Sequence, residues 1–300
     1  MVRYFLHPRF YQKNMTREMI RSGEGENNPR IEDIYQGALR QHEAFRQISE
    51  DQMKAVIRQT ISTIDQLEMI GERDKHDFRL SDEDAKKIAA IWVFSGPGTY
   101  DSPTKDDRYK DYAWAAGMDR VRLNYAARLA RRITEAVRGE KFKAESLTDV
   151  PRAKQALKEA ILHEGPYIIY NGTQLENAVV EDVLAREGTV IPQEKVEVIK
   201  ENINTTVDQI KTFRLPPDIS TQDREIALVS HAPHLARVTH MLNRYQPFPE
   251  TTGVRLFPLP TPAAGKTQYA DMEIMGLLYY IYLSPGQDAT EAPYPYLING

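Results

Sequence analysis

The sequence of 300 residues contains no cysteine. This absence excludes disulfide bonds, thiolate nucleophiles, cysteine-ligated zinc and iron–sulfur clusters. Residues 1–8 also lack the sustained apolar stretch of a secretory signal. Neither the cysteine content nor the N-terminal sequence therefore points to an oxidising compartment. We therefore expect a cytoplasmic protein.

Long apolar runs and an excess of either charge are also missing. The longest apolar run, residues 274–283, is shorter than the ~18 residues that a membrane-spanning helix needs, so the sequence predicts no membrane span. Lysine and arginine number 39 and aspartate and glutamate 43, which gives a formal net charge of −4. A chain with this charge balance is not expected to bind nucleic acid.

What the sequence does contain is an alternation of strand and helix patterns. Residues 88–94 form an apolar run that is typical of a strand buried on both faces of a parallel sheet. Further strands are expected at 166–170, 196–199, 225–229 and 253–258, and helices at 118–137, 151–161, 174–186, 207–213, 235–242 and 271–283. Residues 102–117 are polar and aromatic and are expected to form a surface loop. This order predicts a three-layer α/β/α sandwich with a mostly parallel sheet.

The region before this alternation is expected to be helical. Residues 31–48, and a second helix that begins at the capping-box sequence 49–52, have apolar residues at helical spacing, which predicts an αα-hairpin at 31–70. Its apolar faces either pack on the rest of the protein or bind a partner protein or a second copy of the chain. We predict an N-terminal helical region at 1–84, a Rossmann-type α/β domain at 85–285 and a C-terminal coil at 286–300.

Short polar clusters follow the predicted strands. These clusters contain Ser95, Gly96 and Gly98; Asn171 and Gly172; Asn204 and Thr205; and His231 and His234. The carboxyl ends of parallel strands share one edge, where helix N-termini attract phosphate, carboxylate or ribose groups. The sequence therefore predicts a crevice for a small molecule at that edge. Each cluster also has a plainer interpretation, since Ser95 to Gly98 suits a tight turn and Asn204-Thr205 suits a helix cap.

Taken in order, these clusters resemble the YdcF/SanA/ElyC family. The resemblance covers about residues 88–260 and rests on Ser95-Gly96, Arg120 and Arg122, Asn171-Gly172, Glu176, the Ile-Pro-x-Glu-x-Val stretch at 191–196, Asn204-Thr205, and His234-x-x-Arg237. Asn202 and Asp208 depart from the family pattern. The resemblance implies a Rossmann-like fold and, for a YdcF-type member without a membrane anchor, S-adenosylmethionine binding. It implies no established reaction.

Several of these residues have a chemistry of their own. His231 and His234 could act as acid, base or metal ligands, with Glu176 or Asp208 as a third ligand, although nothing in the spacing requires a metal and we predict none. The plainer interpretation is that one histidine caps a helix while the other is exposed. Arg237 suits a phosphate, a carboxylate or a surface ion pair. Glu176 suits ribose hydroxyls or the dipole of its own helix.

Three functional hypotheses follow. In the first, the glycines 96, 98 and 172 let an adenosine-containing ligand approach, Glu176 binds its ribose, and Asn204, Thr205 and Arg237 bind its charged end, with S-adenosylmethionine as the expected ligand. In the second, the chain is a hydrolase or transferase for a phosphorylated or nucleotide-linked substrate, with His231 or His234 as general base and Arg120, Arg122 and Arg237 around the phosphates. In the third, the chain is a non-enzymatic regulator that binds a partner through the hairpin.

Overall fold

The computed structural model describes residues 28–95, 105–142, 150–172, 177, 180, 190–201, 203, 205–217, 219, 224–245, 254–262 and 267–283. For residues 105–118, 243–244 and 267–269 it describes the backbone alone. The statements below concern these residues.

Five parallel strands form one sheet. They are β1 (Ile88–Phe94), β2 (Tyr167–Asn171), β3 (Val196–Val198), β4 (Glu225–His231) and β5 (Arg255–Thr261). Their order in the sheet is β3-β2-β1-β4-β5, and every neighbouring pair is parallel. The predicted α/β fold with a parallel sheet is therefore confirmed, and each predicted strand lies within about three residues of an observed one.

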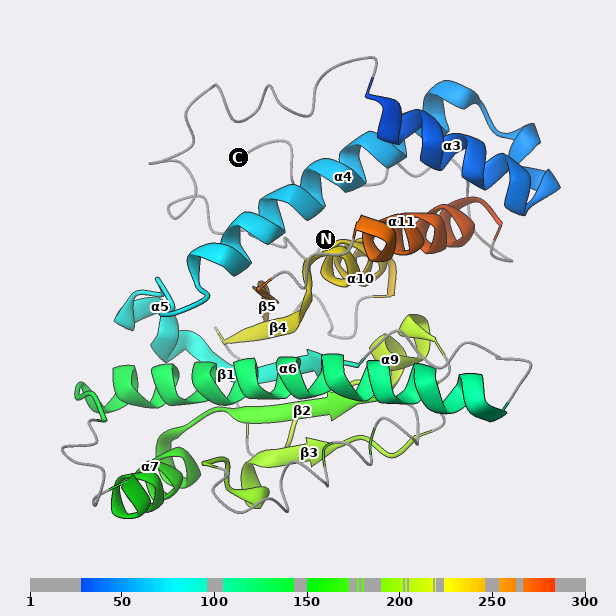
Figure 1. Cartoon of the computed structure of the whole chain (residues 1–300). Coiled ribbons are helices and arrows are strands. Elements are labelled where there is room, and N and C mark those ends of the chain that lie inside the picture. The colour runs from blue at the N-terminus through cyan, green and yellow to red at the C-terminus, as the bar shows by residue number, and fades with distance from the viewer. Residues whose placement is uncertain are drawn as a thin grey trace.

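Helices cover both faces of the sheet (Figure 1). The helices after the N-terminal region are α5 (Asp82–Lys87), α6 (Lys105–Arg138), α7 (Val150–Glu164), α9 (Thr206–Thr212), α10 (Ala232–Tyr245) and α11 (Thr267–Tyr282), and two short 3-10 turns are η1 (Glu43–Gln47) and η2 (Gln193–Lys195). Alternate side chains of a strand point to opposite faces. Accordingly Ile91 and Val93 pack with α6, whereas Trp92 and Phe94 pack in the core that contains α9, α10 and α11. The sheet is thus the middle layer of three.

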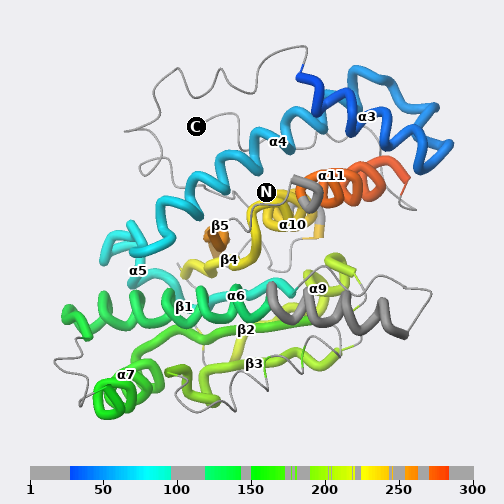
Figure 2. The backbone as a smooth tube through the Cα atoms, in the orientation of Figure 1, coloured from blue at the N-terminus to red at the C-terminus, as the bar shows by residue number. Residues whose placement is uncertain are grey.

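The N-terminal helices belong to that second core. Helix α3 (Pro29–Gln41) ends at His42, which has an extended backbone and caps η1, so the helix predicted over 31–48 is broken there. Helix α4 (Glu50–Arg73) packs on α10, α11 and β5, as the course of the chain in Figure 2 shows. The contact with β5 is close: a Cβ on Gly71 would lie 3.0 Å from the Thr261 carbonyl oxygen. The apolar faces of α3 and α4 therefore pack inside the chain's own core. The predicted division of the chain into three regions stays a prediction.

Helix α6 begins at Lys105, so the prediction of a surface loop over 102–117 is wrong from residue 105 onward. Residues 102–104 lie outside the described residues. The sequence from 105 to 138 contains no proline and one glycine, Gly117, whose cost of about 1 kcal/mol within a helix is small for a helix of 34 residues. The polar and aromatic composition of 105–117 had suggested a loop because it lacks the apolar stripe of the later turns.

Strand β4 continues to His231, two residues beyond the predicted end. Ser230 and His231 pair with Pro260 and Thr261 of β5, so the neighbouring strand extends the ladder into the polar sequence.

No helix within the described residues combines the length and apolar character needed to cross a bilayer. The cytoplasmic location stays a prediction.

Candidate functional site

The sheet has one topological switch point, between β1 and β4. From β1 the chain continues through α6 on one face, and from β4 it continues through α10 on the opposite face. In open parallel sheets the ligand crevice lies outside the carboxyl ends of the strands at such a point. Three groups of buried polar side chains lie at this edge, and their geometry determines what the site can do.

The first group, the Asn171 cluster, consists of Trp92, Ser95, Asn171 and Gln209. The Trp92 indole N–H donates to Asn171 Oδ1 at 2.8 Å, and the Asn171 side-chain amide donates to the Gln209 carbonyl at 2.6 Å. The Gln209 amide donates in turn to Ser95 Oγ and to the Asn171 carbonyl. Ser95 and Asn171 were predicted to face a ligand, but here their side chains join β1 and β2 to α9. Both are buried, and their described contacts are structural.

The second group, the Arg122 cluster, consists of Asp119, Arg122, Tyr170 and His231. Arg122 and Asp119 are both 0% exposed, and Arg122 Nη1 lies 2.7 Å from Asp119 Oδ1. The Tyr170 hydroxyl donates to the other oxygen of Asp119, also at 2.7 Å. Arg122 Nε donates to His231 Nδ1 at 3.0 Å. The cluster therefore links α6, β2 and β4 across the switch point.

This geometry sets the protonation state of His231. A guanidinium has only donors, so His231 Nδ1 must accept, and the neutral ring carries its proton on Nε2. Burial of the ring and the nearby Arg122 charge lower the pKa of His231 to about 2. At neutral pH the imidazole is uncharged and carries its N–H at Nε2. It is poorly suited to take up a proton.

The third group, the His234 cluster, consists of His234, Arg237 and Glu273. His234 Nδ1 lies 3.1 Å from Glu273 Oε1, and Arg237 Nε lies 2.5 Å from Glu273 Oε2. Arg237 Nη2 also lies 3.3 Å from Nδ1, but the shorter contact with the Glu273 carboxylate, which only accepts, favours the tautomer with the proton on Nδ1 and the lone pair on Nε2. That nitrogen is buried and has no hydrogen-bond partner among the described residues. Burial lowers the pKa of His234, and the Glu273 charge opposes that shift.

The other predicted site residues have contacts outside these three groups or lie outside the described residues. Thr205 caps α9: its hydroxyl accepts from the Asp208 N–H while Asp208 accepts from the Thr205 N–H, a complete capping box. Gly172 N–H donates to Asn177 Oδ1, and Arg120 is half-buried on α6. Gly96, Gly98, Glu176 and Asn204 lie outside the described residues.

Sequence reasoning did not identify Asp119, Tyr170 or Glu273. Asp119 stands three residues before Arg122, which is the spacing of a helical ion pair, so the sequence did contain a signal for it. Glu273 is an acidic residue within an apolar helix, which is also a signal in the sequence for a buried polar group. Its partner His234 is 39 residues away, so the pairing itself could not be predicted. Within the described ranges, no group of three or more histidine, aspartate or glutamate side chains could hold a metal ion.

Comparison with known proteins assigns no relative. No family model, curated protein or solved structure matches the chain. The resemblance to the YdcF/SanA/ElyC family therefore stays a prediction. The fold and the switch-point clusters define the chain as a protein with a Rossmann-like parallel sheet, and the function is argued from the site.

Proposed function

We propose that the chain binds an adenosine-containing small molecule, with S-adenosylmethionine as the first candidate, at the switch point between β1 and β4. The sheet order β3-β2-β1-β4-β5 carries this proposal, because it creates one switch point at the end of the strand that Gly96 and Gly98 follow. Glycines after the first strand allow a ligand to approach the backbone. The choice of an adenosine-containing ligand rests on the sequence alone, through the resemblance described above and through Glu176.

The described side chains add two groups to this proposal. His231 is held neutral, so it adds no positive charge beside the ligand. Arg237 keeps 21% of its side chain exposed while it pairs with Glu273, so it supplies positive charge near the same edge. Asn171 and Thr205, in contrast, have structural hydrogen bonds, and we assign them no ligand contact. The proposed ribose-binding residue remains Glu176.

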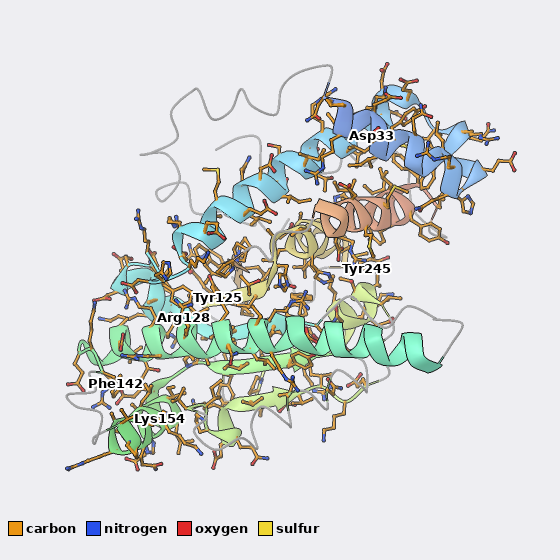
Figure 3. All side chains as sticks on the ribbon, in the orientation of Figure 1. Asp33, Tyr125, Arg128, Phe142, Lys154 and Tyr245 are labelled. Carbon is orange, nitrogen blue, oxygen red and sulfur yellow. The ribbon has the colours of Figure 1, made fainter. Side chains whose placement is uncertain are left out.

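Isothermal titration with S-adenosylmethionine tests this proposal, with S-adenosylhomocysteine and ATP as comparisons. We expect micromolar binding of the first ligand that Glu176→Gln weakens about tenfold, since the variant loses charge-assisted hydrogen bonds to the ribose. Asp33→Asn is the matched control, because Asp33 is an exposed carboxylate on the distant helix α3 (Figure 3). The proposal fails if none of the three compounds binds, or if both variants weaken binding equally.

A second candidate function is favoured by the His234 cluster. Glu273 holds the His234 imidazole at Nδ1, where Arg237 Nη2 also lies within 3.3 Å; with the lone pair on Nε2, this is the arrangement by which histidine serves as general base. The chain would then be a hydrolase or transferase for a phosphorylated or nucleotide-linked substrate. Of the two histidines that the sequence offered, this candidate assigns the base to His234, because Arg122 already donates to the acceptor nitrogen of His231.

Turnover assays with p-nitrophenyl phosphate and with nucleoside triphosphates test the second candidate. We expect His234→Gln to lower kcat/KM about a hundredfold, within the range that general-base catalysis contributes. His163→Gln changes an exposed histidine of α7 and should leave turnover intact. Absence of turnover with every substrate, or equal activity of both variants, would leave only the binding proposal.

The third hypothesis, a regulator that uses the hairpin at 31–70, receives no support from these contacts. The apolar residues of α3 and α4 lie in one core with β1, β4, α10 and α11. Among the apolar residues of these two helices that stay exposed is Met69, at 43%. We therefore propose no partner for this region.

A further inference from the structure

A cavity of about 290 Å³ lies beside the C-terminal half of α6, away from the switch point. Arg122, at the switch point, and Arg132, at the cavity, are ten residues apart on α6, which corresponds to about 15 Å along the helix axis. Six of the side chains that line the cavity carry charge: Asp77, Arg128, Arg131, Arg132, Glu135 and Lys141. Four of these are cations and two are anions. The cavity is therefore basic in a chain whose net charge is negative.

The three arginines are held in place by backbone carbonyls. Arg128 donates to the His76 carbonyl at 3.0 Å and Arg132 to the Leu80 carbonyl at 2.5 Å. Arg131 donates to the Phe142 carbonyl. A carbonyl fixes a guanidinium without cancelling its charge. The three side chains are thus ordered before any ligand arrives, which reduces the entropy that binding costs.

Only part of this positive charge is neutralised. Arg131 pairs with Glu135 at 2.8 Å, and Arg132 pairs with Asp82 at 2.7 Å. Arg128 and Lys141 have no carboxylate within ion-pair distance among the described side chains. Among the described lining residues the four cations outnumber the two anions, Asp77 and Glu135, so the cavity keeps a net positive charge.

Aromatic rings form part of the cavity wall. Phe78 is 6% exposed, and the Arg128 guanidinium lies 5.4 Å from the centre of its ring. The Tyr125 ring makes an edge contact with the Phe78 ring, at 4.9 Å between ring centres. Figure 3 shows Tyr125 and Arg128 on the C-terminal half of α6 and Phe142 just beyond its end. Low-dielectric walls beside an excess of cations strengthen the field at the cavity.

From these observations we propose that the cavity binds a phosphate-bearing small molecule. Guanidinium groups match phosphate oxygens with paired donors, and the Lys141 ammonium adds a mobile point charge. A volume of about 290 Å³ is at the lower end of the range for small-molecule pockets, so it suits a diphosphate or a sugar phosphate. This site is separate from the switch point and does not depend on the function proposed there.

Isothermal titration of the full chain with inorganic pyrophosphate tests the proposal, with orthophosphate as the smaller probe. We expect Arg128→Gln and Lys141→Gln each to weaken pyrophosphate binding about tenfold, as the loss of a charge-assisted contact requires. Lys141 is exposed, so its variant keeps the fold even if Arg128→Gln disturbs the packing of Phe78. Binding should also weaken as the salt concentration rises.

Two controls separate the cavity from other cations of the chain. Arg40→Gln removes an exposed charge from α3, and Arg46→Gln removes an exposed charge from η1. We expect both to bind pyrophosphate as the unmodified chain does. The proposal is overturned if pyrophosphate does not bind, or if Arg40→Gln or Arg46→Gln weakens binding as much as Lys141→Gln.

Discussion

The Asp119→Asn variant is expected to lose about 3–5 kcal/mol of unfolding free energy, which is the usual cost of breaking a buried ion pair by removing one partner. Asp119 and Arg122 are both 0% exposed, so no water replaces the lost charge. The asparagine amide would also place an N–H group where the carboxylate accepts from Arg122 or from Tyr170. The variant therefore keeps a buried guanidinium without its counter-charge.

Urea denaturation followed by circular dichroism at pH 7 measures this loss. Asp33→Asn is the control, because it makes the same chemical change on the exposed surface of α3 and should alter stability by less than about 0.5 kcal/mol. The double variant Asp119→Leu/Arg122→Met removes both charges and should be more stable than Asp119→Asn. If Asp119→Asn and Asp33→Asn unfold at the same urea concentration, the ion pair does not stabilise the fold.

The second large effect concerns acid. We expect His231 to make the fold less stable by about 3 kcal/mol at pH 4 than at pH 7. Burial and Arg122 lower the pKa of His231 from about 6.5 in the unfolded chain to about 2 in the fold. Between these values the unfolded chain binds one more proton than the fold does. Stability therefore falls as the pH drops below about 6.5, and His234, whose pKa is also lowered, adds in the same direction.

A comparison with His231→Asn isolates this contribution. The asparagine Oδ1 stands near the position of His231 Nδ1 and can accept from Arg122, but asparagine does not titrate. The variant should therefore lose about 3 kcal/mol less than the unmodified chain between pH 7 and pH 4 when urea curves are compared. Equal losses in the two chains would mean that His231 titrates normally in the fold.

These buried groups also bear on the proposed function. The Arg122 cluster holds His231 as a neutral donor, and the His234 cluster leaves an acceptor nitrogen on the other imidazole. Two histidines of the same sequence thus receive opposite hydrogen-bonding roles from their neighbours. For the functions proposed above, His231 is therefore suited to a donor role and His234 to an acceptor role.

The fold class followed from local patterns. Strand β1 was predicted at its exact bounds because its seven residues are all apolar, and a strand covered on both faces needs such a run; six of the seven are buried. Helix α10 was predicted because its apolar residues recur at helical spacing. The first turns of α6 were missed, since their polar and aromatic residues show no such spacing. Local sequence predicts an element only where burial imposes a pattern on it.

The sequence by itself therefore determined the strands, most of the helices and the polar residues at the strand ends. Only the tertiary structure decided which of those residues meet. The order β3-β2-β1-β4-β5 places β1 beside β4, although more than 120 residues separate them, and it brings Arg122 of α6 to His231 of β4. It also turns Asn171 inward to Trp92 and pairs His234 with Glu273. Such contacts depend on crossovers through whole helices, and no residue spacing encodes them.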